Sequence, residues 1–450
     1  MLARLTLLSF ALVVVACGTT SELRERSKDA SSAHDAAAAG DASSDRDARG
    51  ASAASGLEAG VSDAHLGDAS RDAESTMSAG DARASDAGGA TSAERESFVY
   101  VGGSDWSGEP FPFRSYRLDR GTGTLTPLQA SVDLGLNPSY ATPSASGRFL
   151  YVANEDERAP GVTVASIDPL DGHVTKLEQR PFTGGGGFVF TSLDPSGKYL
   201  LAADHNGGRA VVYPVQSDGK LAAPSDTESF ASGAHTHSIR TDPSGKWAYV
   251  PNKDLHSVAQ FSLDAASGKL TALAPATVAA PGGPRHIVFT PDGRFAFVIL
   301  EYDDKVNAYA LGGDGTLTQV DSQSSLPAGF SGENTGAHVL VHPNGKFLYA
   351  SNRGHNSIVV FAIDGAGKLA LVQHAPTLGK TPRNFDVDAT GELLVVANQG
   401  DDNANNGSLV VFAIGRDGKL AQRGSAVTGL RSPNAVAIVT RARPVITVAP

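Results

Sequence analysis

The apolar positions of this chain recur in short runs, and a glycine-containing turn introduces each run. Examples are SASGRFLYVANE, DPSGKYLLAADH, DPSGKWAYVPN, TPDGRFAFVILE, HPNGKFLYASN and DATGELLVVANQ. Runs rich in Val, Phe, Tyr and Ile, bounded by Pro-Asp-Gly or Asp-Gly-Lys, indicate β-strands joined by tight turns. No stretch after Phe98 has the period of an amphipathic helix. The pattern therefore predicts an all-β fold.

The turn glycines repeat at a nearly constant interval. One series has spacings of 50, 48, 48, 52 and 46 residues and consists of Gly147, Gly197, Gly245, Gly293, Gly345 and Gly391. In a second series of seven, a leucine follows each glycine closely: Gly123, Gly172, Gly219, Gly268, Gly315, Gly367 and Gly418. Seven such units, each with strand and turn patterns only, predict a seven-bladed β-propeller of four-stranded antiparallel blades.

The two ends of the repetitive region complement each other. The first unit opens with FVYVGG, which aligns with a second strand, so its own first strand is missing. A matching first strand, SPNAVAIV, occupies Ser432 to Val439. We therefore predict that this segment is the inner strand of the N-terminal blade and closes the ring without an open sheet edge. The propeller is predicted to span 98–440, followed by a tail over 441–450.

The N-terminal residues have a different composition from the repeats. MLARLTLLSFALVVVACGTT combines an early arginine with an apolar run too short to span a membrane comfortably, which indicates an export signal. Its Val-Val-Ala-Cys ending resembles a bacterial lipoprotein box, in which cleavage leaves a lipid-modified Cys17. An ordinary signal peptide is the alternative. We predict a signal peptide over 1–17, a disordered Ala/Ser/Asp-rich tether over 18–97, and lipid anchoring in a bacterial cell envelope, on the periplasmic or outer-membrane face.

Charge and cysteine content narrow the classes of partner. The chain has a formal net charge of -11, and most of this excess lies in the predicted tether, so the repeats are only mildly acidic. Nothing in that balance favours nucleic acid. Cys17 is the only cysteine, which excludes an intramolecular disulfide. We expect a monomer that contacts the membrane only through its N-terminal lipid.

Polar residues cluster where first strands begin and second strands end. Arg285 and His286 precede one apolar run and Glu301 follows the next. In an antiparallel blade these two points lie on the same side of the sheet, so all seven blades should present them at one mouth of the ring. The other residues at such positions are Glu155, Asp204, His205, His235, His237, Asn252, His338, Asn352, Arg353, Arg383, Asn398 and Gln399. Strict alternation along a strand predicts that His286 points away from Arg285 and packs against the blade.

Four blade motifs carry a family resemblance: HTHSIRTDPSGKWAYVPN, GPRHIVFTPDGRFAFVILE, HVLVHPNGKFLYASNRGHNSIVVF and KTPRNFDVDATGELLVVANQ. From about Phe98 to Val439 the chain resembles the lactonase family of seven-bladed propellers, which includes bacterial 6-phosphogluconolactonases and fungal carboxymuconate cyclases. The resemblance implies opening or closing of a lactone without a metal or other cofactor. The catalytic residues it implies are His237, Arg285, Glu301 and Arg353. The residues we predict to contact substrate are Glu155, His235, His338, Asn352 and Arg383.

Three segments at the predicted mouth depart from the family pattern. The usual Asn-Tyr before Gly-Gly is DHNGG here, with Asp204 and His205. The usual Pro-Asp-Leu-Gly after the histidine blade is PNKDLHS, and the asparagine commonly found before the glutamate is Leu300. These departures lie on the predicted functional face, so they bear on the identity of the substrate and not on the fold.

Each implied residue has a chemical role and a structural alternative. Glu301 is predicted to act as a base or proton shuttle, and Arg285 and Arg353 to bind a carboxylate, phosphate or oxyanion. His237 could donate to the leaving ring oxygen or orient water. Two nearby arginines, however, would lower the pKa of Glu301 and weaken it as a base. The structural alternatives are an Arg285–Glu301 ion pair, a turn capped by Asn352 and Arg353, and packing of His235, His286 and His338.

Three functions remain open at this point. The first is an exported, lipid-anchored lactonase for a sugar or aldonic lactone; export argues against 6-phosphogluconolactone, a cytoplasmic intermediate. The second is a non-catalytic propeller that binds a glycan or protein partner at the envelope. The third is a metal-dependent lactonase of another propeller class, although the HxH pair of His235 and His237 has no identifiable third and fourth ligands.

Overall fold

A computed structural model describes residues 95–401 and 404–443. Cys17, the predicted signal peptide, most of the predicted tether and residues 444–450 lie outside the described residues. Every regular element in the described part is a β-strand, as predicted. Within these ranges no helical segment has the length and hydropathy needed to span a bilayer.

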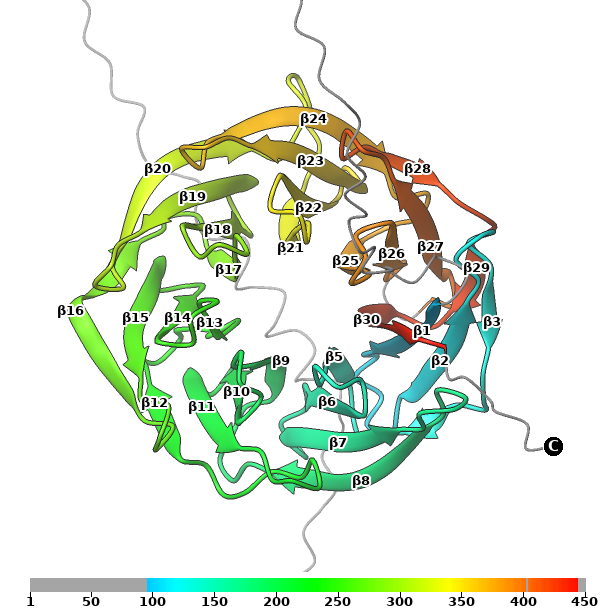
Figure 1. Ribbon diagram of the computed structural model, residues 1–450, viewed down its shortest axis with the longest axis horizontal. Helices are drawn as coiled ribbons and strands as arrows, with labels where there is room; N and C mark the ends of the chain where they lie inside the picture. Colours follow the sequence, from blue (N-terminus) through cyan, green and yellow to red (C-terminus); the bar gives the residue numbers. More distant parts are fainter. Residues whose placement is uncertain (1–94, 402–403, 444–450) are drawn as a thin grey trace, which may run out of the picture. The chain divides into compact units, whose positions relative to one another are not determined.

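The described strands form seven antiparallel sheets arranged as blades around a central axis (Figure 1). Blade 1 contains β30 (Pro433–Ala442), β1 (Arg95–Gly103), β2 (Pro112–Leu118) and β3 (Leu125–Pro127), with β4 (Val132–Asp133) paired to β2. Blade 2 contains β5 (Pro138–Pro143), β6 (Phe149–Asn154), β7 (Gly161–Ile167) and β8 (Val174–Pro181). Blade 3 contains β9 (Phe188–Leu193), β10 (Tyr199–Asp204), β11 (Arg209–Pro214) and β12 (Asp226–Ser229). Blade 4 contains β13 (Arg240–Thr241), β14 (Trp247–Asn252), β15 (Ser257–Leu263) and β16 (Leu270–Ala279).

The remaining three blades follow the same order from the axis outward. Blade 5 contains β17 (Pro284–Phe289), β18 (Phe295–Leu300), β19 (Lys305–Leu311) and β20 (Leu317–Ser324). Blade 6 contains β21 (Thr335–Val341), β22 (Phe347–Arg353), β23 (Ser357–Ile363) and β24 (Leu369–Pro376). Blade 7 contains β25 (Pro382–Val387), β26 (Leu393–Asn398), β27 (Gly407–Ile414) and β28 (Leu420–Gln422), with β29 (Val427–Leu430) paired to β27. The predicted seven-bladed propeller is confirmed.

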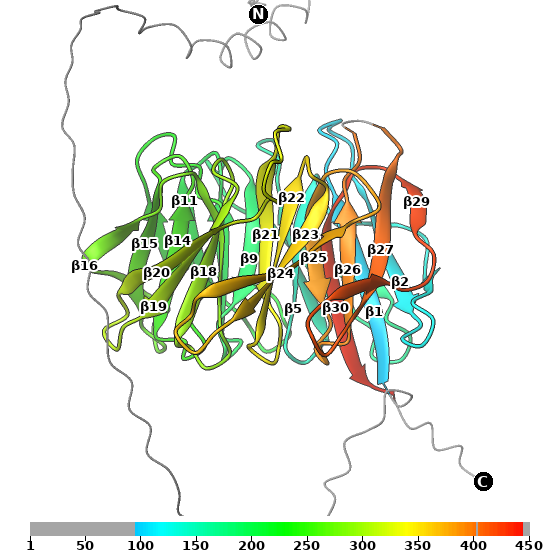
Figure 2. The ribbon, with the colours of Figure 1, turned by 90° about the horizontal axis from the view of Figure 1, so that it is seen from above.

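The ring closes between the two ends of the propeller, as the sequence predicted. Strand β30 lies innermost in blade 1 and pairs antiparallel with β1, from Arg95 opposite Ala442 to Gly103 opposite Pro433. Figure 1 shows the red C-terminal strand beside the blue N-terminal one, and Figure 2 shows the same pair from the side. Strand β1 begins at Arg95, three residues before the predicted start of the propeller.

The glycine series with a following leucine holds neighbouring blades together. Gly219, in the outer turn of blade 3, has a φ of +83°, and a Cβ added there would lie 2.4 Å from the ring of Phe149 in blade 2. Only glycine accepts both that dihedral angle and that contact. Tyr151 of blade 2 also donates its hydroxyl to the Gly219 carbonyl, at 3.0 Å. The fifty-residue repeat is therefore a repeat of the blade-to-blade contact.

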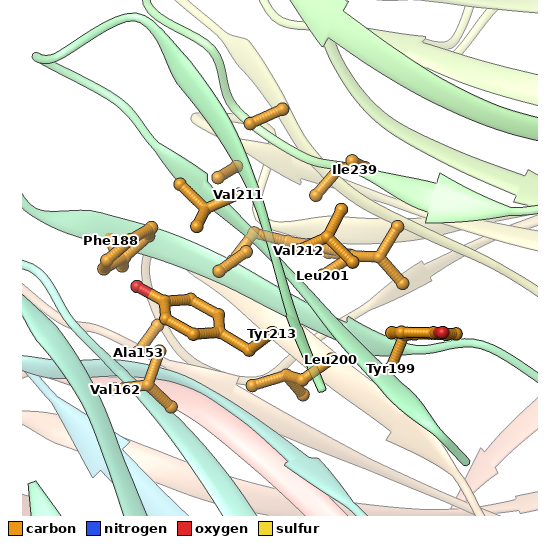
Figure 3. Close-up of a cluster of buried hydrophobic side chains, with 14 of the residues drawn as sticks. Ala153, Val162, Phe188, Tyr199, Leu200, Leu201, Val211, Val212, Tyr213 and Ile239 are labelled. Atoms are coloured by element: carbon orange, nitrogen blue, oxygen red, sulfur yellow. The ribbon is translucent and has the colours of Figure 1, made fainter. Parts of the chain in front are cut away.

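Apolar side chains fill the space between adjacent blades. Figure 3 shows one such region, where Ala153 and Val162 of blade 2 and Phe188 and Tyr213 of blade 3 belong to one buried cluster. All four side chains are fully buried. Such packing fixes the spacing of the blades and so the positions of the polar residues at the mouth.

Candidate active site at the mouth of the ring

The inner hairpin of blade 5 brings Arg285 and Glu301 together. Glu301 follows the last residue of β18, and its N–H donates to the Gly283 carbonyl just before β17, at 2.7 Å. The Arg285 Nε lies 3.1 Å from the Glu301 Oε2. The two side chains are thus neighbours despite their separation in sequence, as the hairpin geometry predicted.

Three cationic side chains surround the Glu301 carboxylate. Besides Arg285, the Arg353 Nη2 lies 3.1 Å from Oε1 and the Lys253 Nζ lies 3.8 Å from the same oxygen. Burial raises the pKa of Glu301, but Arg285, Arg353 and Lys253 outweigh it and lower that pKa from 4.5 to about 2. Glu301 is therefore ionised and a weak base at neutral pH, as expected from the two arginines beside it.

The two arginines also hold the start of the next inner strand. Arg285 donates from Nη1 to the Ala337 carbonyl at 2.6 Å, and Arg353 donates from Nη2 to the Gly336 carbonyl at 3.0 Å. Burial, followed by repulsion from Arg353, lowers the pKa of Arg285 to about 9, which leaves it charged at neutral pH. Both side chains therefore combine a scaffolding contact with a positive charge at the mouth.

A β-bulge overturns the predicted orientation of His286. The register of β17 against β18 shifts between Pro284 and His286, so Arg285 is the extra residue and strict alternation fails there. The Arg285 Nη1 lies 3.2 Å from the His286 Nε2, which means that both side chains face the axis. Our prediction that His286 points to the opposite face was wrong. The same irregularity occurs at the start of the inner strand in six of the seven blades.

Two buried histidines occupy the axis next to the charged cluster. The Nδ1 atoms of His286 and His338 are 2.7 Å apart, so one donates and the other accepts. Burial, with Arg285 as the next cause for His286 and Arg240 for His338, lowers the pKa of both rings well below 6.5. Phe385 lies edge-on to His338 at 5.0 Å between ring centroids. We predicted that His338 contacts substrate. In the structure its ring packs against those of His286 and Phe385.

A small cavity of about 10 Å³, enough for about one water molecule, lies beside Arg285 on the axis. Its walls carry polar groups from five blades: Ser139, Glu155, His237, Arg285, His286, Arg383, Asn384 and Asn434. Ser139 Oγ, His237 Nδ1 and Asn434 Oδ1 are buried without a hydrogen-bond partner in the protein. Leaving a buried polar atom unpaired costs about 1–3 kcal/mol, so the cavity is suited to a water molecule or to one polar group of a ligand.

The remaining predicted residues occupy different environments. Arg383 and Glu155 line the cavity, with the Arg383 Nη2 3.9 Å from the Glu155 Oε1. Asn352 is fully buried and donates to the Ser325 carbonyl at 2.8 Å, so its amide braces a loop beside blade 6. His235 donates through Nδ1 to the Asp254 carboxylate, and its side chain is 36% exposed.

His237 stands in an irregular segment. Strand β13 covers only Arg240–Thr241, and the preceding residues are tied to β14 by a single bridge between Thr236 and Asn252. Burial, followed by repulsion from Arg285, lowers the pKa of His237 well below 6.5, so its ring is neutral. A neutral imidazole here can donate or accept one hydrogen bond but carries no proton to give away as an imidazolium.

Sequence reasoning missed Lys253 and Asp254 as members of the site. Both belong to PNKDLHS, one of the departures from the family pattern, and Lys253 contacts Glu301. Burial lowers the pKa of Lys253 from 10.5. The departure from the family pattern was the signal in the sequence that could have identified them. It lies just after the end of β14, and the ends of second strands were predicted to carry functional residues.

Metal ligation has no candidate cluster in the part of the chain that the structure describes. No group of three or more His, Cys, Asp or Glu side chains there is arranged to hold an ion. A surface pocket of about 500 Å³ lies over the 157–160 and 181–185 loops, but it contains no comparable set of buried charges. Charge and burial, rather than volume, mark the mouth as the candidate site.

Comparison with known proteins gives consistent results. Residues 98–439 match the family described as "Lactonase, 7-bladed beta-propeller". The 6-phosphogluconolactonase of Bacillus subtilis is 30% identical over 307 residues, which cover 66% of this chain and 86% of the relative. That of Formosa agariphila is 32% identical over 295 residues, covering 61% and 82%. The structure of the periplasmic gluconolactonase of Pseudomonas aeruginosa has a TM-score of 0.69 at 30% identity and covers 78% of this chain and 100% of the other.

Proposed function

The chain belongs to the lactonase family of seven-bladed β-propellers, and on that premise we propose that it hydrolyses a sugar or aldonic lactone at the mouth of the ring. The observation that carries the proposal is the Glu301 carboxylate held between Arg285, Arg353 and Lys253. One anion among three cations leaves net positive charge in a mostly buried site. Such a site favours the oxyanion that forms when a lactone carbonyl is attacked.

The guanidinium groups supply the charge stabilisation in this proposal. Arg285 and Arg353 have side chains only 4% and 12% exposed, so their fields act where little water screens them. Paired N–H donors suit a carbonyl oxygen that becomes negative. Glu301 orients both groups in the free enzyme, and His237, whose Nδ1 has no protein partner, is placed to bind the ring oxygen or a water.

Hydrolysis in this proposal depends on no metal. The candidate groups are cations and imidazoles that the chain itself supplies, and within the described residues no group of three or more His, Cys, Asp or Glu side chains is arranged to hold an ion. The substrate would be an unphosphorylated lactone outside the cytoplasm. The relative named periplasmic gluconolactonase supports this choice.

A lactone-panel assay on a fragment beginning at Glu94 tests the function. We expect hydrolysis of 1,5- and 1,4-aldonolactones, with the rate unchanged by EDTA. Loss of activity on chelation would instead favour a metal-dependent lactonase. Retention of a glycan or an envelope protein without hydrolysis of any lactone would favour the non-catalytic alternative.

Anchoring through Cys17 is a separate part of the proposal. Its basis is the Val-Val-Ala-Cys ending of an apolar N-terminal run, since Cys17 lies outside the described residues. We expect the full chain to incorporate labelled palmitate in a bacterial host and to sediment with membranes. Cys17→Ala should lose the label and become extractable by buffer, whereas Cys17→Ala protein that still carries label would contradict lipidation there.

A further inference from the structure

A pair formed by His235 and Asp254 lies at the mouth, outside the set of residues that the family resemblance implies. The His235 Nδ1 is hydrogen-bonded to the Asp254 Oδ2, and the Tyr302 hydroxyl donates to the other carboxylate oxygen at 2.7 Å. Asp254 is a carboxylate: burial raises its pKa, but the hydrogen bonds from Tyr302 and His235 outweigh that effect and lower it. A carboxylate accepting from Nδ1 fixes the hydrogen on that nitrogen and leaves Nε2 as a proton acceptor.

The backbone holds this pair in place. The Asp254 N–H donates to the Ala234 carbonyl at 3.2 Å, and the Lys253 N–H donates to the His235 carbonyl at 3.3 Å. His235 itself has a φ of +47°, a left-handed conformation that is uncommon for a residue with a side chain. The loop before β13 is thus built to aim this imidazole at the end of β14.

His205 provides a second fixed imidazole. Its ring stacks on His235 with centroids 4.6 Å apart and planes inclined by 21°. The Asn206 side chain donates to Glu157 at 2.7 Å, which turns its carbonyl oxygen toward the His205 Nδ1, also at 2.7 Å. The hydrogen of His205 is therefore on Nδ1. Burial lowers the pKa of His205 to about 4, so this ring stays neutral.

The rings of His235 and His205 connect the exposed mouth with the buried residues around Arg285. His205 lies edge-on to His237 at 5.2 Å, and His237 lies 5.2 Å from His286, which contacts Arg285. His235 and Asp254 have side chains 36% and 33% exposed, so water and a substrate ring can reach them. Among the described residues, none hydrogen-bonds to the His235 Nε2.

We propose that His235 is the general base of lactone hydrolysis. Asp254 positions the His235 imidazole through the hydrogen bond to Nδ1, and the stacked ring of His205 restricts its rotation. This inference rests on the proposed function and names the proton acceptor which that function needs. Glu301 cannot easily fill the role, because its three cationic neighbours hold it as a weak base. The segments DHNGG and PNKDLHS, which depart from the family pattern, contribute His205 and Asp254 to this site.

Hydrolysis moves one proton from water to His235 and then to the leaving oxygen. A water oxygen bonds to the lactone carbonyl carbon while one water proton passes to the His235 Nε2, and the carbonyl electron pair moves onto oxygen opposite Arg285 and Arg353. The tetrahedral intermediate then collapses, breaking the bond between the carbonyl carbon and the ring oxygen. The ring oxygen takes the proton back from the His235 imidazolium, which yields a hydroxy acid and restores the neutral base.

The charged and titratable groups facing His235 come from three blades. Asp254 and Lys253 lie on the segment after β14, Tyr302 and Glu301 follow β18, and His205 follows β10. The Lys253 Nζ lies 5.3 Å from the centre of the Tyr302 ring, so that cation faces Glu301 and the phenol rather than bonding to the imidazole. An imidazolium formed during turnover is therefore balanced by Asp254.

Steady-state hydrolysis of glucono-1,5-lactone by the wild type and three variants tests the base. Asparagine tolerates a left-handed backbone, so His235→Asn should fold; we expect its kcat to fall by about 100-fold or more. Asp254→Asn should lower kcat by about tenfold or more, because the imidazole loses its fixed tautomer. Asp303→Asn, an exposed carboxylate next to Tyr302, is the matched control and should keep wild-type rates.

Chemical rescue separates a base from a structural residue. His235→Gly keeps the left-handed backbone and opens space for free imidazole, which should restore about tenfold or more of the lost rate above that of imidazole alone. An inactive His235→Gly that imidazole does not rescue would overturn the role as base. His235→Asn and Asp254→Asn with wild-type kcat would also overturn it while leaving the lactonase function standing. A wild type that hydrolyses no lactone would remove the proposed function, and this inference with it.

Discussion

Replacing Glu301 by glutamine will remove most of the lactone turnover and several kcal/mol of stability. Arg285, Arg353 and Lys253 would keep their charges and lose the anion that balances them. Breaking a buried ion pair on one side costs about 3–5 kcal/mol, and losing one positioned oxyanion donor costs about 100- to 1,000-fold in kcat. We expect both effects together, because the carboxylate holds the two arginines that face the substrate.

The stability effect should depend on pH in one direction. The pKa of Glu301 is lowered from 4.5 to about 2 by folding, so its contribution is complete above pH 4.5 and is lost as pH falls toward 2. That shift corresponds to about 3 kcal/mol. The free energy of unfolding of wild type should exceed that of Glu301→Gln by this amount at pH 7, and the difference should shrink below pH 4.5.

Denaturant titrations of both proteins between pH 2 and 7 measure that difference. Glu109→Gln, which changes an exposed carboxylate in the loop after β1, is the control and should follow the wild type at every pH. A Glu301→Gln variant with wild-type turnover would remove Glu301 from the site. A constant stability difference down to pH 2 would show that the surrounding cations do not act on its ionisation.

The fold could be predicted because the repeating glycines mark contacts between neighbouring blades as well as the turns between strands. Gly219 and five of its six counterparts recur about every fifty residues because each must accommodate an aromatic ring from the previous blade, such as Phe149; Gly123 is the exception and lies against Arg423. That constraint is local and visible in the sequence. The convergence of Arg285 and Glu301 followed from antiparallel geometry alone, since a hairpin places the start of one strand beside the end of the next.

The details of the site could not be predicted from alternation, because the inner strands are irregular where they begin. One extra residue in β17 turns both Arg285 and His286 toward the axis, and period-2 reasoning assigned them to opposite faces. Asn352 occupied a position typical of a site residue, yet its amide bonds to Ser325. Only the position of each side chain relative to neighbouring blades settles such cases.

Lys253 and Asp254 could not be assigned to the site from the sequence for a different reason. Their sequence, PNKDLHS, differs from the family pattern, and a departure identifies a place where chemistry has changed without saying what replaced it. The contacts of Lys253 with Glu301 and of Asp254 with His235 join blades 4 and 5 and the loop before β13. The sequence gives no direct measure of contacts between blades at such non-repeating positions.

Ending the chain after Leu430 will prevent the propeller from folding. The deletion removes β30, which pairs with β1 over its whole length, and the buried side chains of Val436, Ile438 and Val439. Burying an aliphatic side chain of this size contributes about 1.5–3 kcal/mol, so these three account for roughly 5–9 kcal/mol. A domain is typically stable by only about 5–15 kcal/mol, and the deletion also exposes the inner edge of blade 1.

Circular dichroism and gel filtration will distinguish the outcomes, with a chain ending after Arg443 as the matched control. That control keeps all of β30 and should melt at the wild-type temperature. The shorter chain should aggregate or lose its cooperative transition, and a peptide of residues 431–443 supplied in trans should restore it by adding the missing strand to β1. A cooperative, monomeric fold of the shorter chain without the peptide would show that β30 does not close the ring. The positions of Asn384 and Asp386 in blade 7 would then need another restraint, because they now accept the N–H groups of Val436 and Ile438, at 3.0 and 2.7 Å.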